Sequence, residues 1–161
     1  MDALEQLKKD VDDFSFALAK VGEKIDLDPK SVFAKTKGDM AMAMLNLAAS
    51  DGFFAEHEAV AINAAIDLGL SREEMFDVIK KNNFPSVDYL TQVPASLKLV
   101  CELDKAINSK GGNSNLAGAL IDIYNRLFVL TVVSDGKKDE NELMSHTIAI
   151  KVMVEYAKEN R

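Results

Sequence analysis

Residues 44–52 read MLNLAASDG, and residues 128–136 read FVLTVVSDG, 84 positions further along the chain. Each copy is an apolar segment that ends in Ser-Asp-Gly and is followed by an acidic segment, so that Glu58 corresponds to Glu142. Asp-Gly is typical of turns, because Asp tolerates turn conformations and Gly supplies a positive φ. Each copy therefore predicts a helical hairpin, at about residues 40–68 and 116–158.

Apolar periodicity predicts further helices on both sides of the repeat. From Leu4 to Ile25 apolar residues recur in steps of three and four, which indicates one buried helix face. Asp28-Pro29 supplies an N-cap and a first-turn proline for a second helix, with a possible break at Gly38. Helices are expected up to Leu68 before Gly69, and after the capping box that Ser71 begins.

The second half of the chain follows the same pattern. Residues 82–94 contain two prolines and several polar residues, which favours a loop with at most one short helix. Pro94 can begin a helix that reaches about Asn108, and Gly111-Gly112 marks the next turn. No strand or hairpin signal is present. The sequence therefore predicts an all-α bundle of about seven helices in one domain, residues 1–161, with the two hairpins related by an approximate twofold axis.

Composition narrows the possible functions. Asp and Glu number 26 against 19 Lys and Arg, a formal net charge of −7, and no basic stripe is present, which argues against nucleic-acid binding. The single cysteine, Cys101, is flanked by apolar residues and is expected to be a buried thiol in a reducing compartment. The N-terminal segment lacks the features of a secretory signal. Leu116–Val133 is interrupted by Asp122, Asn125 and Arg126, which favours a core helix over a membrane span.

The repeated acidic residues are the candidate site. Asp51 and Asp135 are predicted at helix C-termini, where the helix dipole disfavours a carboxylate by roughly 0.3 to 1 kcal/mol. A divalent cation would offset this cost, because Ca²⁺ and Mg²⁺ prefer hard oxygen ligands. If the two hairpins meet, Asp51, Glu58, Asp135 and Glu142 could supply four carboxylates.

Helix capping is the alternative explanation of the same residues. Asp139-x-x-Glu142 forms a complete capping box, which needs no metal. Ala55 stands at the corresponding position of the first copy, so capping explains Glu58 less well. An EF-hand is excluded, because its loop has alternating ligands and a glycine at the sixth position.

Other candidate chemistries have weaker support. His57 and His146 could join a transition-metal site, but neither is repeated in the other copy, which favours packed or surface histidines. The sequence has no Gly-rich phosphate loop, Ser-His-Asp signature or Cys-x-x-Cys pair. We therefore expect a protein that is not an enzyme.

The twin Asp-Gly-x-x-x-x-x-Glu motifs, at Asp51 to Glu58 and Asp135 to Glu142, resemble those of the TerB-like tellurite-resistance proteins. The resemblance covers residues 40–66 and 116–150. Phe54 matches the apolar residue that this family has three positions after the Asp, whereas Lys138 departs from it. The resemblance implies an all-helical fold, a cytoplasmic location often near the inner membrane face, and acidic residues proposed to chelate a metal.

These observations lead to one expected function and two alternatives. The expected function is a non-catalytic stress-response protein that binds a divalent cation, Ca²⁺ or Mg²⁺, or protein partners through the shared acidic site. The first alternative is an acidic helical scaffold that docks a basic protein partner without metal. A metal-dependent hydrolase ranks last.

Overall fold

The computed structural model describes residues 1–51, 54–134 and 140–161; of Asp51 it describes the backbone only. It confirms the all-α fold class. No strand occurs in these ranges. The elements are α1 (Ala3–Glu23), α2 (Pro29–Ala48), the 3₁₀ turn η1 (Ala49–Asp51), α3 (Glu56–Ile66), α4 (Arg72–Lys81), the one-turn α5 (Val87–Leu90), α6 (Ala95–Ser109), α7 (Leu116–Val133) and α8 (Glu140–Asn160).

Several helices begin where the sequence predicts. The carboxylate of Asp28 accepts a hydrogen bond from the Ser31 backbone N–H at 3.1 Å, and Pro29 opens α2. Ser71 and Glu74 form the reciprocal capping box of α4, with bonds of 3.1 and 3.2 Å. These bonds satisfy backbone N–H groups that have no partner inside the helix.

Two predicted helix boundaries are wrong. The possible break at Gly38 is absent, since α2 runs unbroken through it. A single glycine costs a helix only about 1 kcal/mol, and the buried residues Thr36 and Met40 on either side hold the helix in the core. Further along, α3 ends at Ile66 instead of Leu68, because Asp67 adopts the left-handed conformation with φ of 58° and terminates the helix.

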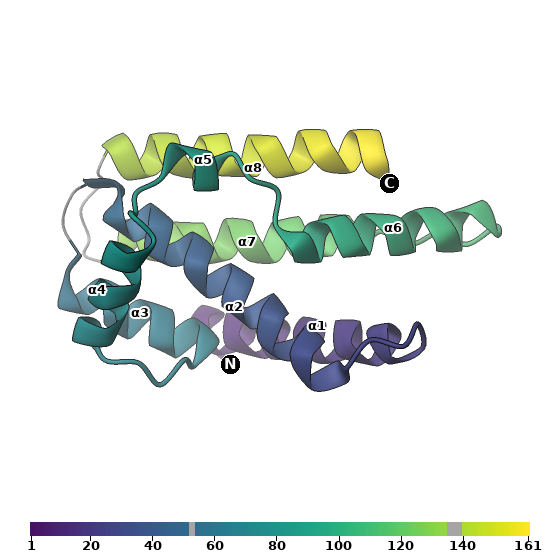
Figure 1. The fold of residues 1–161 in the computed structure, drawn as a ribbon, viewed down its shortest axis with the longest axis horizontal. Coiled ribbons are helices and arrows are strands. Elements are labelled where there is room, and N and C mark those ends of the chain that lie inside the picture. Colours follow the sequence, from purple (N-terminus) through teal and green to yellow (C-terminus); the bar gives the residue numbers. More distant parts are fainter. Residues whose placement is uncertain (52–53, 135–139) are drawn as a thin grey trace.

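Helix α7 is the central element of the bundle. It packs against α1, α2, α3, α6 and α8, and α2 crosses it at an angle (Figure 1). Leu120, Tyr124 and Leu127 on α7 are fully buried, which confirms its place in the core. Cys101 on α6 is also buried, as predicted.

Among the described residues, α7 is also the one helix long and apolar enough to cross a membrane, with 18 residues and a mean hydropathy of 1.6. In this fold 44% of that segment is buried inside the protein. Arg126 on this helix is half-buried and pairs with Asp122 one turn earlier at 3.0 Å and with Asp10 of α1 at 2.8 Å. The ion pair with Asp10 joins two helices that are far apart in the sequence.

The two repeated segments form the helix pairs α2–α3 and α7–α8, each packed internally. Their second helices differ in length, 11 residues in α3 and 21 in α8. The approximate twofold relation between the pairs stays a prediction.

Candidate functional site

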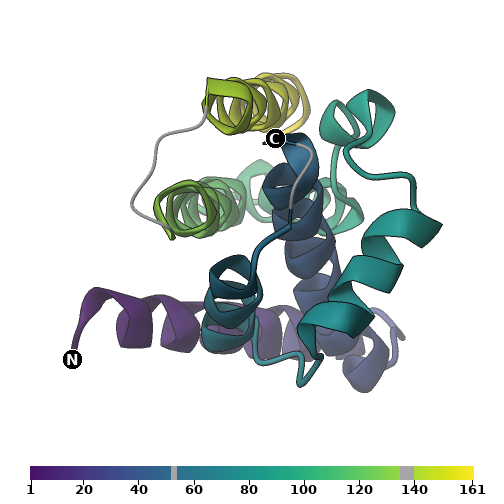
Figure 2. The same ribbon diagram turned by 90° about the vertical axis from the view of Figure 1, so that its left-hand side faces the viewer.

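The repeated motifs converge at one end of the bundle. We define the hairpin end as η1, the first turn of α3, the last turn of α7 and the first turn of α8. These segments lie together on the left of Figure 1, and Figure 2 looks onto them. The turn η1 of the first pair packs against α8, and α3 packs against α7 of the second pair. The two repeats therefore contact each other at this end.

Glu58 lies in the first turn of α3 and is almost completely buried, with 4% of its surface exposed. Its Oε1 accepts a hydrogen bond from the Ala55 backbone N–H at 3.3 Å. Capping thus explains part of the position of Glu58, contrary to the sequence prediction. The prediction failed because this half of a capping box needs only the backbone N–H of the N-cap residue, which alanine also has.

Glu142 occupies the corresponding position in the first turn of α8 and is also buried, with 5% exposed. The acidic residue two positions earlier in each repeat, Glu56 or Glu140, is exposed. Glutamate is rarely buried without compensating interactions, while the positive end of the helix dipole favours carboxylates in all four positions. The repeat thus places one buried and one exposed glutamate at the start of each helix.

The other two predicted ligands cannot be placed. Asp135 and the side chain of Asp51 lie outside the described residues. Asp139 of the predicted capping box lies outside them as well. In the part of the chain that the structure describes, no group of three or more His, Cys, Asp or Glu side chains is arranged to hold a metal ion. At the hairpin end the described residues supply two buried carboxylates, Glu58 and Glu142, hard oxygen donors of the kind that Ca²⁺ and Mg²⁺ accept.

The histidines have local partners. His146 Nε2 lies 2.8 Å from Asn125 Oδ1, and its ring packs edge-on against Phe128 with centroids 5.6 Å apart. Burial lowers the pKa of His146, so that its neutral form is favoured. His57 Nε2 lies 3.9 Å from Glu58 Oε1, within the distance range of an ion pair.

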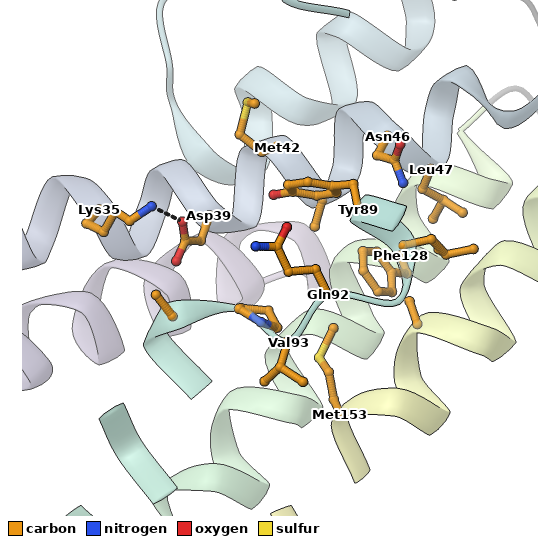
Figure 3. Close-up of a pocket in the computed structure, with 15 residues that line it drawn as sticks. Lys35, Asp39, Met42, Asn46, Leu47, Tyr89, Gln92, Val93, Phe128 and Met153 are labelled. Carbon is orange, nitrogen blue, oxygen red and sulfur yellow. Dashed lines mark ion pairs between the residues drawn. The ribbon is translucent and has the colours of Figure 1, made fainter. Parts of the chain in front are cut away.

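The structure also contains a cavity of about 200 Å³ beside α2, which was not predicted from the sequence (Figure 3). It lies between α2, α5 with the loop after it, α7 and α8. Asp39, Tyr89 and Gln92 line one part, and Leu47, Phe128 and Met153 line another. A sequence signal did exist, because Asp39 and Asn46 are polar residues spaced seven apart on the stripe of α2 that also carries Met42.

Asp39 is the unusual residue of this cavity. Its side chain is 12% exposed, and Oδ1 pairs with Lys35 Nζ at 2.9 Å. Oδ2 is buried and has no hydrogen-bond partner among the described residues. Burial, with the charge of Asp39 as a second cause, raises the pKa of Tyr89 to about 12, so the phenol stays protonated at neutral pH.

Comparison with known proteins gives no further assignment: the chain matches no family model, no curated protein and no solved structure.

Proposed function

We propose that this protein is a non-catalytic binding module whose hairpin end holds a divalent cation. The observation that carries the proposal is the burial of Glu58 and Glu142 while their neighbours Glu56 and Glu140 are exposed. Two buried carboxylates at equivalent positions, at an end where the two repeats contact each other, suit a cation that both repeats share. Asp51 and Asp135 would complete the ligand set that the sequence predicts.

The biological role proposed with this site follows the resemblance to the TerB-like proteins. It is a cytoplasmic response to tellurite or related stress, in which the cation-bound hairpin end engages protein partners. The cation would stabilise one arrangement of the two repeats, and the exposed carboxylates around it would steer a partner.

The test compares melting temperatures with and without Ca²⁺, Mg²⁺, Mn²⁺ and Zn²⁺. At a hundredfold excess over the dissociation constant, a bound cation adds about 2.7 kcal/mol of stability. For a protein of this size that raises the melting temperature by roughly 5 to 10 °C. The double variant Glu58→Gln/Glu142→Gln should lose most of this shift, measured against its own metal-free melting temperature.

The matched control is Glu56→Gln/Glu140→Gln, which removes the same charge from the same two helix turns but from exposed positions. It should keep the shift. Equal shifts in the two double variants, or no shift of the wild type with any of the four ions, would rule out a cation held by the buried pair.

The acidic scaffold is the second candidate function, and the exposed pair favours it. Glu56 and Glu140 face solvent at the same end, where they could attract a basic partner. Under that function Glu56→Lys/Glu140→Lys would weaken salt-sensitive binding of a lysine-rich peptide, measured by fluorescence anisotropy. Glu58→Gln/Glu142→Gln would have little effect on this binding, since buried carboxylates do not contact the peptide.

A further inference from the structure

The cavity beside α2 has a polar part and an apolar part. Figure 3 shows the Tyr89 hydroxyl and the Gln92 amide pointing toward Asp39. The side chains of Leu47, Phe128 and Met153 line the space away from this carboxylate. A molecule that fills the cavity would therefore contact hydrogen-bonding groups at one end and hydrocarbon at the other.

The polar part contains the carboxylate of Asp39 and the ammonium of Lys35. Lys35 pairs with Asp39 Oδ1 only, and its own side chain is largely exposed to solvent. The buried Oδ2 is an ionisable oxygen without a hydrogen-bond donor among the described residues. An unsatisfied buried acceptor of this kind costs free energy, and the cost is larger when the group is charged. A ligand with a cationic donor would remove that cost and gain a charge-assisted hydrogen bond.

The size of the cavity limits the ligand. An engineered apolar cavity of about 150 Å³ holds benzene, so about 200 Å³ accommodates one ring or a short alkyl chain with a small polar group. The aromatic rings of Tyr89 and Phe128 line the same space and add a favourable surface for a ring or a cation. A molecule much larger than one ring would not fit inside this volume.

We propose that this cavity binds a small organic cation, consisting of one aromatic ring or short alkyl chain that carries a primary ammonium group. The ammonium donates to Asp39 Oδ2, with the Tyr89 hydroxyl oxygen and the Gln92 amide oxygen as further acceptors. The apolar group of the ligand packs against Leu47, Phe128 and Met153. This site shares no residue with the hairpin end and is independent of the function proposed above.

The experiment uses three probes that share a phenylethyl group and differ in charge: 2-phenylethylamine, 2-phenylethanol and 3-phenylpropionate. Binding of each to the full chain is measured by titration calorimetry, and its location by shifts of backbone amide signals in NMR spectra. We expect the amine to bind at least tenfold more tightly than the alcohol, since only the amine makes a charge-assisted bond to Asp39. The carboxylate should not bind detectably.

Two variants test the charge dependence of binding, and a third tests the apolar part of the cavity. Asp39→Asn keeps the shape of the side chain and should weaken amine binding at least tenfold, with little effect on the alcohol. Asp77→Asn removes the same charge from the exposed face of α4 and should leave amine binding unchanged. Ala149→Leu, which places a larger side chain in the apolar part, should weaken both the amine and the alcohol.

The proposal is overturned if the amine does not bind at millimolar concentration, which would mean a cavity that holds only water. It is also overturned if the amine and the alcohol bind equally, if Asp39→Asn binds the amine as well as the wild type does, or if the shifted amide signals lie away from α2 and α5. Circular dichroism of each variant checks that the helical fold is retained.

Discussion

Replacing Asp104 should destabilise the protein more than the loss of any surface carboxylate. Asp104 lies on α6, is fully buried, and caps the start of α7 from outside that helix. It accepts hydrogen bonds from the Ser114 hydroxyl at 2.5 Å, the Leu116 backbone N–H at 2.8 Å and the Ala117 backbone N–H at 3.0 Å. It also pairs with Arg161 Nε at 3.3 Å. One side chain thus joins α6, the first turn of α7 and the residue after α8.

Asp104→Ala would leave two backbone N–H groups and a guanidinium without this acceptor. Breaking a buried ion pair from one side costs about 3 to 5 kcal/mol, and three charge-assisted hydrogen bonds at about 1.5 kcal/mol each give a similar sum. We therefore expect a loss of about 4 kcal/mol. At roughly 2 to 4 °C per kcal/mol for this chain length, the melting temperature should fall by about 8 to 16 °C.

The pH dependence of the effect is a separate check. Burial disfavours the charged carboxylate, but hydrogen bonds from Ser114, Ala117, Leu116 and Arg161 outweigh it, and the pKa of Asp104 is lowered. A carboxylate with a lowered pKa in the folded state contributes stability above its unfolded pKa of about 3.9 and loses it as the pH falls through the folded pKa. The difference in unfolding free energy between wild type and Asp104→Ala should therefore be constant from pH 5 to 8 and shrink below about pH 4.

Urea unfolding followed by circular dichroism measures both effects. The control is Asp122→Ala on α7, whose side chain is 64% exposed and whose pair with Arg126 should contribute less than about 1 kcal/mol. A loss below about 1 kcal/mol for Asp104→Ala, or a difference that stays the same at low pH, would refute the reasoning.

Three smaller effects follow from the same structure. Met44→Ala should lower the free energy of unfolding in urea by about 2 to 5 kcal/mol, because the Met44 side chain is fully buried. The control Met144→Ala, at a position that is 63% exposed, should stay within about 0.5 kcal/mol of wild type. Ser71→Ala removes the acceptor for the Glu74 N–H and should cost about 1 kcal/mol; no measurable change would contradict its capping role. Burial raises the pKa of the Cys101 thiol, so labelling by a thiol reagent should be slow in the native protein and fast in denaturant, and equal rates would contradict its burial.

Much of the fold could be predicted from the sequence because its signals are local. Helix starts at Pro29 and after Ser71 depend on residues within one turn, and apolar periodicity marks the helix faces. The wrong boundaries have physical causes of wider range. Tertiary packing overrides the glycine at position 38. Asp67 takes a left-handed conformation and ends α3 two residues before Gly69, which also has a positive φ.

The sites were less predictable than the helices, because they depend on how separate helices pack together. The repeat identified Glu58 and Glu142 as special, and both are buried at one end of the bundle, but the pattern gave no indication of how deeply each side chain lies. The cavity at Asp39 and the network of Asp104 join residues from separate helices. Such groupings depend on how the helices cross, and the sequence of a single helix does not determine the crossing.

The central claim, a cation shared by the two repeats, is tested most directly by adding Mn²⁺ in substoichiometric amounts and recording amide NMR spectra. A paramagnetic ion at the hairpin end should broaden signals around Glu58 and Glu142 together, at the same point of the titration, and spare residues 105–110 at the end of α6. Broadening of only one repeat, or of exposed carboxylates elsewhere, would contradict the shared site.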